Sequence, residues 1–430
     1  MRTKQIAMKF TGWMRAVLAV AVVSVVAACG GSDGSGGGSP TNTNPLNGGA
    51  LPPSPTQQAI APNAANTVPI TVGPGVSGVI NIPTVSVTVC PPGTTTNCQT
   101  ISNVQVDTGS FGLRLVSSAL SPSVLNSLPV STLAGNGSPL AECAAFADGI
   151  TWGTVRTATV KIGGETTKTG IPVQIIGDLP SSAVSAGDCA TSAAQETSND
   201  LGANGILGIG TAPNDCGSNC SDPTGSNYFV CPGGTSCTRT ALTAAQQVAN
   251  PVASFPVDNN GVIVQMTPSV SNLGSPSASG TLVFGIGTQS NNVLVNAQVF
   301  TTDTFGNLNN SVFNGATVQA FLDSGSNAYF FADTTLPLCT SFPDFYCPTS
   351  AQSRSITLVG LNGATAAAPI GILSAATLFS NGSNFAFNDL GGQIAGSGTF
   401  DLGLPFFYGR HVYYGIDQTL SGGPAPFVAY

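Results

Sequence analysis

The sequence VQVDTGSFGLRL at residues 104–115 has a counterpart in QAFLDSGSNAYFF at residues 319–331. Both segments begin with apolar residues typical of a β-strand, continue with Asp-Thr/Ser-Gly-Ser, and end in further apolar residues. Their aspartates, Asp107 and Asp323, are 216 residues apart, which is about the length of one folded lobe. An internal repeat at this distance predicts two duplicated lobes.

The composition favours β-structure in both lobes. The 430 residues include 53 Gly and 30 Pro, whereas only 7% are Asp, Glu, Lys or Arg. Such a composition suits short strands joined by many turns better than long helices with charged surfaces. Short β-branched runs recur from about residue 68 onward, as in VSVTVC at 85–90 and IPVQIIGD at 171–178. The sequence therefore predicts an all-β protein.

The repeated Asp motif also has a chemical interpretation. Two carboxyl groups that adjoin at a lobe interface share a proton and titrate as a coupled pair. The ionised carboxylate can take a proton from water while the protonated one polarises a carbonyl, which hydrolyses an amide without a covalent intermediate. Gly109 and Gly325 allow a tight turn behind each acid, and the hydroxyls of Ser110 and Ser326 can hydrogen-bond to it. We therefore expect the two aspartates to be the catalytic pair.

Further segments give the chain a resemblance to the pepsin-like aspartic peptidases, because they follow the two Asp motifs in the family's order. They are the flap-like FADGITWGTVRTATVKIGG at 146–164, NGILGIG at 204–210 and FDLGLPFFYGRHVYYGID at 400–417. The resemblance covers nearly all of residues 68–430. It implies a bilobal acid-protease fold, in which two β-barrel-like lobes at 67–255 and 256–430 flank a central cleft.

The resemblance implies a role for each residue of the two motifs. Asp107 and Asp323 would form the catalytic dyad, and Thr108 with Ser324 would form a hydrogen-bonded pair across the lobes. The remaining motif residues would support the carboxyl groups of the dyad: Gly109, Ser110, Gly325 and Ser326.

The same resemblance places Phe146, Asp148 and Gly149 in the flap, a β-hairpin that closes over an extended peptide. Three residues depart from the family's pattern. Phe146 stands where the family has a substrate-facing Tyr, and Arg114 stands where a Trp commonly supports that Tyr. Asp401 interrupts the second apolar-apolar-Gly element and places a carboxylate where an aliphatic residue is expected.

These features leave two functional hypotheses open. The first is an aspartic endopeptidase that cuts extended peptides or unfolded proteins, and the intact Asp motifs favour it. The second is a pseudo-peptidase that binds peptides or cell-envelope partners without cleaving them, and the three departures favour it. Neither hypothesis requires a cofactor, and in both we expect a monomer.

Other reaction classes find little support in the sequence. A Ser-His-Asp hydrolase of the α/β type would need the single histidine, His411, as its base, and no Gly-x-Ser-x-Gly elbow between a strand and a helix precedes it. The sequence contains neither HExxH nor the Walker pattern GxxxxGK[ST]. We therefore expect neither metal-dependent nor nucleotide-dependent chemistry.

Residues 1–29 have the features of an export signal. A basic start precedes the apolar stretch 16–26, and the segment ends in Val-Ala-Ala-Cys, which resembles the bacterial lipobox. Cys29 would then be the acylated first residue of the mature chain, whereas a plain secretory signal that contains a Cys is the alternative. Residues 30–66 are rich in Gly, Ser, Pro, Asn and Thr, which predicts a flexible tether. We expect a lipoprotein that is anchored to a bacterial membrane and faces the periplasm or the cell surface. Of the two membranes, the outer one is favoured.

The charge of the chain argues against nucleic acid as a partner. Four of the eleven basic residues and none of the nineteen acidic ones lie within residues 1–29, so the remainder has seven basic residues and a net charge of −12. A strongly acidic protein without a basic cluster is poorly suited to bind phosphate backbones. We therefore expect no nucleic-acid binding.

The cysteines indicate an oxidising compartment. Beyond Cys29 the chain contains ten cysteines, an even number that predicts disulfides in an exported protein. A zinc site formed by Cys216, Cys220, Cys231 and Cys237 is the alternative, although the spacings differ from the usual CxxC pattern. Connectivity does not follow from sequence, but close spacing favours Cys90 with Cys98, Cys216 with Cys220, Cys231 with Cys237, Cys339 with Cys347, and Cys143 with Cys189 as a longer closure.

Overall fold

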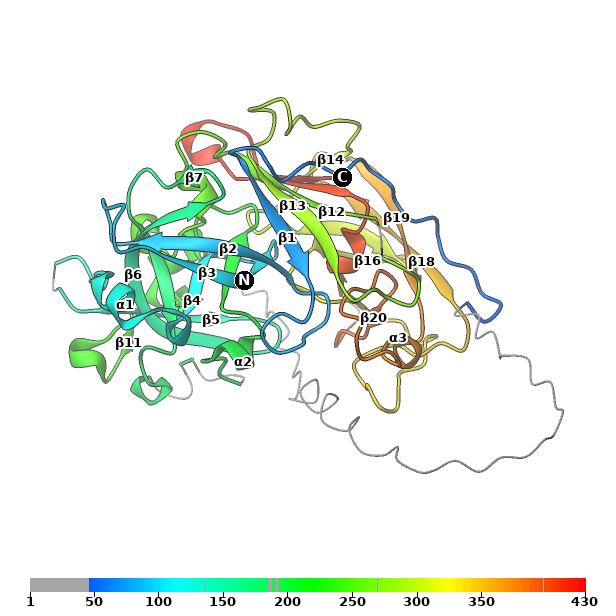
Figure 1. Ribbon diagram of the computed structural model, residues 1–430, viewed down its shortest axis with the longest axis horizontal. Helices are drawn as coiled ribbons and strands as arrows, with labels where there is room; N and C mark the ends of the chain where they lie inside the picture. Colours follow the sequence, from blue (N-terminus) through cyan, green and yellow to red (C-terminus); the bar gives the residue numbers. More distant parts are fainter. Residues whose placement is uncertain (1–45, 136, 185–187, 190–192, 269, 397) are drawn as a thin grey trace, which may run out of the picture.

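A computed structural model describes residues 46–430 except 136, 185–187, 190–192, 269 and 397. The expected signal segment 1–29 with Cys29, and the first part of the expected tether, lie outside the described residues. The chain forms two β lobes that lie side by side, with the strands β1, β12 and β13 between them (Figure 1). The predicted all-β, two-lobed fold is confirmed.

The first lobe is a closed ring of strands, because an additional pairing of β6 with β2 joins its two ends. Four further strands extend the ring. The longest is β5 (Leu140–Ala145), and the others are β7 (Glu165–Thr166), β10 (Tyr228–Val230) and β11 (Thr238–Arg239). The ring itself pairs in the order β2 (Pro83–Cys90), β3 (Gln99–Asp107), β9 (Gly205–Ile209), β4 (Phe111–Val116), β8 (Ile171–Ile176) and β6 (Ile150–Ile162).

The second lobe is built on a seven-stranded sheet whose core is aromatic. The rings of Phe331 and Phe400 stack with centroids 4.8 Å apart, and Phe313 meets both rings edge-on. The strands pair in the order β19 (Thr365–Ile372), β18 (Gln352–Val359), β15 (Leu308–Phe313), β16 (Ala316–Leu322), β21 (Thr399–Leu402), β17 (Tyr329–Phe331) and β20 (Gly391–Gly392).

A run of six strands continues the sheet of the first lobe into the second half of the chain. Its first strand pairs with β2 on one side and with β13 on the other, so the boundary between the lobes is itself a β-ladder. The order is β1 (Thr67–Val72), β13 (Ala278–Phe284), β12 (Gly261–Met266), β22 (His411–Gly415), β23 (Phe427–Ala429) and β14 (Val299–Thr301).

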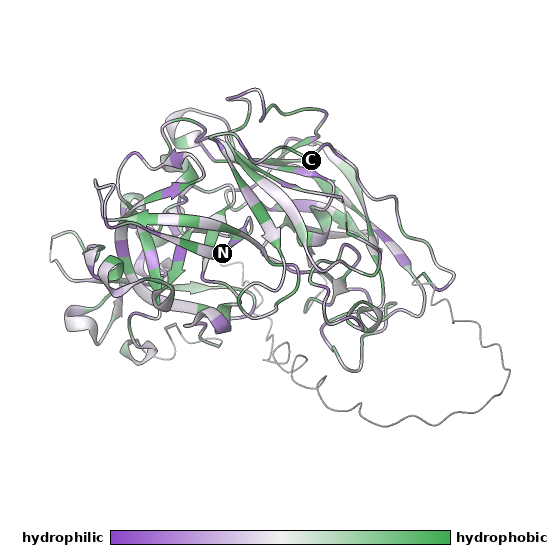
Figure 2. Cartoon of the chain, in the orientation of Figure 1, coloured by the Kyte–Doolittle hydropathy of each residue, from purple (hydrophilic) through white to green (hydrophobic). Residues whose placement is uncertain are grey.

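Helices are short and decorate the strands. The α-helices are α1 (Pro122–Ser127), α2 (Ser198–Leu201) and α3 (Ala375–Leu378). In the part of the chain that the structure describes, no helix has the length and apolar character needed to cross a membrane. Figure 2 shows that the most hydrophobic residues gather on the strands, which is where the buried Val, Ile, Leu and Phe side chains of the core are found.

The two lobes repeat one four-strand pattern. In the first lobe β9 lies between β3 and β4, parallel to β3 and antiparallel to β4, and β4 is parallel to β8. In the second lobe β21 lies in the same way between β16 and β17, and β17 is parallel to β20. In each lobe the Asp motif forms the loop that connects the two strands on either side of the inserted strand, β3 to β4 in the first lobe and β16 to β17 in the second. The repeat in the sequence is therefore also a repeat in topology.

All five favoured cysteine pairs are present as disulfides. The zinc alternative is wrong, because each of its four cysteines is bonded to another cysteine and has no thiolate to offer a metal. The bonds are Cys90–Cys98, Cys143–Cys189, Cys216–Cys220, Cys231–Cys237 and Cys339–Cys347.

The expected tether is wrong for residues 46–66, which lie along the folded body. The Ala351 N–H donates to the Leu46 carbonyl at 2.9 Å, and the Gln57 N–H donates to the Gly409 carbonyl at 2.9 Å. A segment of small and polar residues becomes ordered when its backbone groups find partners on neighbouring chain. Composition alone could not reveal those partners.

A buried amide joins the chain before β2 to the second lobe. Asn81 is fully buried and has a φ of 50°. Its Nδ2 donates to the carbonyls of Asn327 and Phe387, both at 2.8 Å. Its Oδ1 accepts the Phe387 N–H at 2.8 Å and the Tyr408 hydroxyl at 3.0 Å. All the hydrogen-bonding capacity of the amide is therefore used across the lobes.

We predict that Asn81→Gly lowers the free energy of unfolding by about 3 kcal/mol or more, because several buried partners lose their hydrogen bonds at ~1–3 kcal/mol each. Glycine tolerates the positive φ, so the substitution adds no backbone strain. Asn103→Gly is the matched control, since Asn103 has a φ of 54° but is only half-buried. Urea unfolding measures both variants, and equal losses would contradict the prediction.

Candidate active site

The two motif aspartates adjoin across the boundary between the lobes. Asp107 ends β3, and Asp323 follows directly after β16. A Cβ atom added at Gly109 would lie 2.5 Å from the Asp323 Cγ, and one added at Gly325 would lie 2.6 Å from the Asp107 Oδ1. Each motif glycine thus faces the carboxyl group of the other lobe at a distance that leaves no room for a side chain. The structure brings the two predicted acids into one site.

Four hydrogen bonds link the two Asp loops reciprocally. The Thr108 N–H donates to the Ser324 Oγ at 3.2 Å, and the Ser324 N–H donates to the Thr108 Oγ1 at 2.8 Å. The two hydroxyls donate onward across the boundary, Thr108 to the Leu322 carbonyl at 3.2 Å and Ser324 to the Val106 carbonyl at 2.7 Å. Both side chains are buried, so water does not compete for these bonds.

Each carboxyl group also receives two donors from its own motif. One oxygen accepts the N–H of the motif glycine, and the other accepts the hydroxyl of the motif serine. The distances are 2.9 and 2.5 Å at Asp107 and 2.8 and 3.0 Å at Asp323. The orientation of both acids is therefore fixed by the loops that carry them.

The electrostatics of the pair favour one shared proton. Burial and then the neighbouring charge of Asp323 raise the pKa of Asp107 well above its ordinary value, although hydrogen bonds from Ser110 and Gly109 lower it in part. Two adjoining carboxyls in a buried site cannot both ionise easily. The arrangement can therefore present one acid and one base to the same substrate atom.

A third carboxyl group lies next to the second Asp loop. Asp401 of β21 is only 5% exposed, and the Ser326 Oγ lies 2.5 Å from its Oδ2. Burial and then the charges of Asp323 and Asp107 raise the pKa of Asp401, whereas the hydrogen bond from Ser326 lowers it. The expected departure from the family's pattern is thus a buried acid in contact with a residue of the second motif.

A cavity of about 330 Å³ lies beside the second Asp loop and is lined by both lobes, although neither Asp107 nor Asp323 is among its lining residues. The first lobe contributes Phe146, Asp148 and Ile206, and the second contributes Gly325 and Ser326. The cavity gives a bound molecule access to the second Asp loop from beneath the predicted flap.

The flap is a hairpin that starts earlier than the segment predicted for it. Its strands are β5 and β6, and the Phe146 N–H closes the turn by donating to the Gly149 carbonyl at 2.8 Å. Phe146, Asp148 and Gly149 therefore form the tip rather than the first strand. Residues 140–145, Leu-Ala-Glu-Cys-Ala-Ala, contain no β-branched side chain, so the residue types in this segment do not predict a strand.

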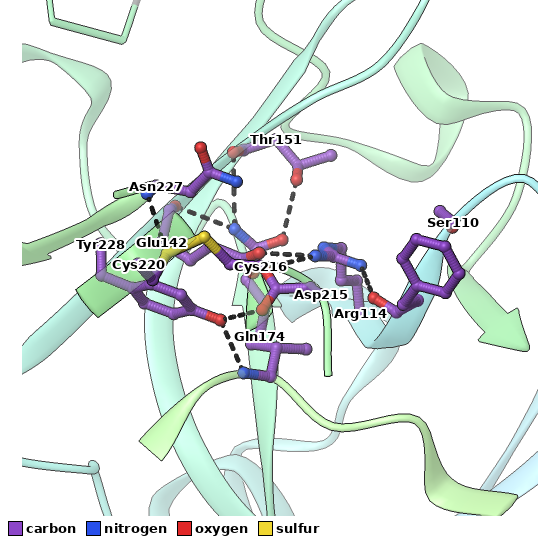
Figure 3. A network of polar contacts seen from close by, with 12 residues as sticks. Ser110, Arg114, Glu142, Thr151, Gln174, Asp215, Cys216, Cys220, Asn227 and Tyr228 are labelled. Carbon is purple, nitrogen blue, oxygen red and sulfur yellow. Dashed lines mark hydrogen bonds and ion pairs between the residues drawn. A yellow bond between two sulfur atoms is a disulfide. The ribbon is translucent and has the colours of Figure 1, made fainter. Parts of the chain in front are cut away.

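A buried ionic network connects the flap to the first Asp loop (Figure 3). The Arg114 guanidinium donates to Glu142 of β5 at 2.5 Å, to Asp215 at 3.3 Å and to the Phe111 carbonyl at 2.8 Å. Its Cζ also lies 5.7 Å from the centre of the Phe146 ring. Arg114 thus contacts the residue after the Asp motif, the flap strand and the flap tip together.

The sequence did not identify the partners of Arg114. Glu142 and Asp215 are 28 and 101 residues away from it, and the Tyr228 hydroxyl donates to the Asp215 Oδ1 at 2.6 Å. Burial and then the charge of Glu142 raise the pKa of Asp215, although Arg114 opposes this rise. The sequence did indicate that Arg114 has an acidic partner, because a lone Arg within an apolar strand requires a buried anion.

Two β lobes that each contribute one aspartate to a shared site define the pepsin-like class of folds. The chain belongs to the family described as "Protein of unknown function (DUF3443)", which matches residues 62–430. The sequence matches none of the curated proteins. Among solved structures, the aspartic proteinase from Irpex lacteus is similar, with 16% sequence identity, 85% of this chain and 97% of that chain covered, and a TM-score of 0.49.

We predict that Arg114→Met lowers the free energy of unfolding by about 3 kcal/mol or more at neutral pH, because Glu142 and Asp215 stay buried without their cation. Burial raises the pKa of Asp215, so protonation of Asp215 should reduce the loss as the pH falls. Urea unfolding at neutral and mildly acidic pH measures both effects. Lys168→Met removes an exposed cation and should change little, so equal losses in the two variants would contradict the prediction.

The buried carboxyls should make the protein more stable in mild acid than at neutral pH. Burial raises the pKa of Asp389 to about 7, and it is also the largest cause of the raised pKa of Asp107, Asp215 and Asp401. These groups bind protons more tightly in the folded than in the unfolded chain, whose carboxyl pKa is ~4. The free energy of unfolding therefore rises as the pH falls from about 7 toward about 4.

The thermal midpoint at a pH of about 5 should accordingly exceed that at a pH of about 7.5. Asp389→Asn removes one of the titrating groups and should reduce the difference between the two midpoints. A midpoint that increases toward neutral pH would show that the folded chain does not hold the extra protons.

Proposed function

We propose that the protein is an aspartic endopeptidase that hydrolyses extended peptides in the cleft between its lobes. The observation that carries this proposal is the adjoining pair of Asp107 and Asp323. Each acid has its own hydroxyl and N–H donors, and four reciprocal hydrogen bonds hold the two loops together. Such an arrangement is costly to bury unless the proximity of the two acids is used.

The proposed reaction uses the single proton that the pair shares. The ionised carboxylate takes a proton from water as the water oxygen attacks the scissile carbonyl carbon, and the protonated carboxyl donates its proton to the carbonyl oxygen. The resulting tetrahedral diol breaks down when a carboxyl returns a proton to the amide nitrogen and the C–N bond breaks. Because burial raises the pKa of Asp107, that residue is the better candidate for the acid.

The cavity and the flap tip favour a peptide substrate. Phe146 and Asp148 line the same cavity as Gly325 and Ser326, so a chain bound there would lie between the hairpin and the second Asp loop. An extended peptide or an unfolded segment of protein can enter a cavity of about 330 Å³ that both lobes line, whereas a folded domain cannot. We therefore take unfolded protein as the substrate class.

A pseudo-peptidase that binds peptides without cleavage is the second candidate. The observation that favours it is Asp401, a third buried titratable carboxyl beside the pair, because the reaction needs a defined number of protons at this site. Phe146 also lacks a hydroxyl that could bond to a substrate. The experiment below decides between the two candidates.

We also propose that the protein works outside the cytoplasm as a monomer bound to a bacterial membrane through a lipid on Cys29. Five disulfides support an oxidising compartment, since they persist there and are rare in the cytosol. The lipobox-like end of residues 1–29 supports the lipid. The outer membrane, with the body facing the periplasm or the cell surface, is the location we favour.

We predict a bell-shaped pH profile for the cleavage of a generic unfolded protein. Turnover should fall in acid as both carboxyls become protonated and fall again at higher pH as the pair loses its shared proton. The alkaline limb should lie well above the reference carboxyl pKa of ~4, because the pKa of Asp107 is raised. The measurement is the initial rate of peptide-bond cleavage at pH values between about 3 and 8.

Asp107→Asn and Asp323→Asn should each reduce this rate by about 10³-fold or more, because neither variant can hold the shared proton. Asp389→Asn removes a buried acid that forms no hydrogen bond to either Asp motif, and it should retain activity. If wild type and both dyad variants cleave nothing at any pH yet bind the same unfolded protein, the pseudo-peptidase is the correct function.

A further inference from the structure

The two lobes differ at one position of their repeated motif. Ile206 of β9 pairs with Gln105, two residues before Asp107, and Asp401 of β21 pairs with Phe321, two residues before Asp323. Ile206 and Asp401 are therefore duplicates of each other. The first lobe has an aliphatic side chain next to its Asp loop, whereas the second has a carboxyl group.

The surroundings of Asp401 disfavour its ionised form. The side chain is 5% exposed, its Oδ1 has no hydrogen-bond partner among the described residues, and no ion pair of the described residues includes it. The ionisable groups that act on it are Asp323, Asp107 and Tyr414, none of which carries a positive charge. A carboxylate in such a place costs far more than a neutral acid.

The Ser326 hydroxyl lies between two acids but has a single hydrogen. Its Oγ is 2.5 Å from the Asp401 Oδ2 and 3.0 Å from the Asp323 Oδ2. One hydroxyl cannot donate to both carboxylates at once, although it can donate to one and accept from the other. A chain of two hydrogen bonds thus requires that one of the two acids be protonated. In the first lobe Ser110 faces no such competition, because Ile206 offers no acceptor.

We propose that Asp401 is a protonated positioning residue, whose carboxyl donates to the Ser326 Oγ and so directs the Ser326 hydroxyl to Asp323. The inference rests on the proposed function for its effect on turnover, but the protonation of Asp401 stands on the contacts alone. Asp401 touches no substrate and acts on the dyad only through Ser326. It makes Asp323 the acceptor at the end of a fixed chain of hydrogen bonds.

The arrangement gives the site a dependence on pH beyond that of the dyad. As the pH rises through the raised pKa of Asp401, its carboxylate becomes an acceptor and draws the Ser326 hydroxyl away from Asp323. Asp323 then loses a donor and faces a new negative charge. The protonated state of Asp401 is therefore the competent one, and its loss contributes to the alkaline limb of the activity.

Carbon-13 NMR of aspartate side-chain carboxyls tests the protonation directly, without a substrate. In the purified protein at a pH of about 5, where exposed aspartates are ionised, the signal that disappears in Asp401→Asn should be that of a neutral carboxylic acid. Asp401→Ile, which copies the first lobe, should shift the titration of the Asp107 signal. A carboxylate signal for Asp401, or an unchanged titration of Asp107 in Asp401→Ile, would overturn the proposal.

The activity of the two variants supplies the second readout. The asparagine amide still donates to Ser326 and cannot ionise, so Asp401→Asn should have an alkaline limb at higher pH than wild type. Asp401→Ile loses the donor and should be about ten- to hundredfold slower than Asp401→Asn. Asp389→Asn is the control for the loss of a buried acid. Equal rates and equal limbs in the two Asp401 variants would overturn the proposal.

The outcomes for Asp401 and for the proposed function are distinguishable. If the wild type cleaves no substrate, the peptidase function fails, and the NMR titrations still decide whether Asp401 is protonated and whether it acts on the pair. If the wild type is active and Asp401 titrates as an ordinary carboxylate, only the positioning role fails.

Discussion

The structure depends on the reciprocal hydrogen bonds between Thr108 and Ser324. Each residue offers its backbone N–H and its hydroxyl across the boundary between the lobes, so four buried groups are satisfied only when both lobes are in register. Any shift of one lobe would leave these groups without partners at a substantial free-energy cost. The same constraint fixes the adjoining carboxyls, because each acid directly precedes one of these two residues: Asp107 precedes Thr108, and Asp323 precedes Ser324.

Much of this arrangement could be predicted from the sequence, because the Asp motif occurs twice in it. Two Asp-Thr/Ser-Gly-Ser motifs at a lobe's distance predicted both the duplicated topology and the meeting of Asp107 with Asp323. Cysteine spacing likewise favoured the five pairs that form. Contacts without a local signature could not be predicted. The packing of residues 46–66 depends on backbone partners such as Ala351 and Gly409, far away in sequence, and the partners of Arg114 come from two different segments.

The departures from symmetry are concentrated in one pair of duplicated positions. In the first lobe Arg114 of β4 pairs with Ile206 of β9, and in the second Phe330 of β17 pairs with Asp401 of β21. Each lobe therefore buries one ionisable and one apolar residue in the same cross-strand pair, but on opposite strands. The Arg114 guanidinium of the first lobe lies in the flap network, and the Asp401 carboxyl of the second lobe contacts its Asp loop. The two lobes share one arrangement of strands, and the residues of this cross-strand pair distinguish them.

The distribution of the disulfides has a mechanical consequence. Cys90–Cys98, Cys143–Cys189, Cys216–Cys220 and Cys231–Cys237 all lie in the first lobe, and Cys339–Cys347 lies in the second. Among the described residues no disulfide spans the boundary, so within this part of the chain only the polypeptide itself joins the lobes covalently. Oxidation therefore stiffens each half internally without cross-linking one lobe to the other, and the position of the lobes relative to each other depends on non-covalent contacts.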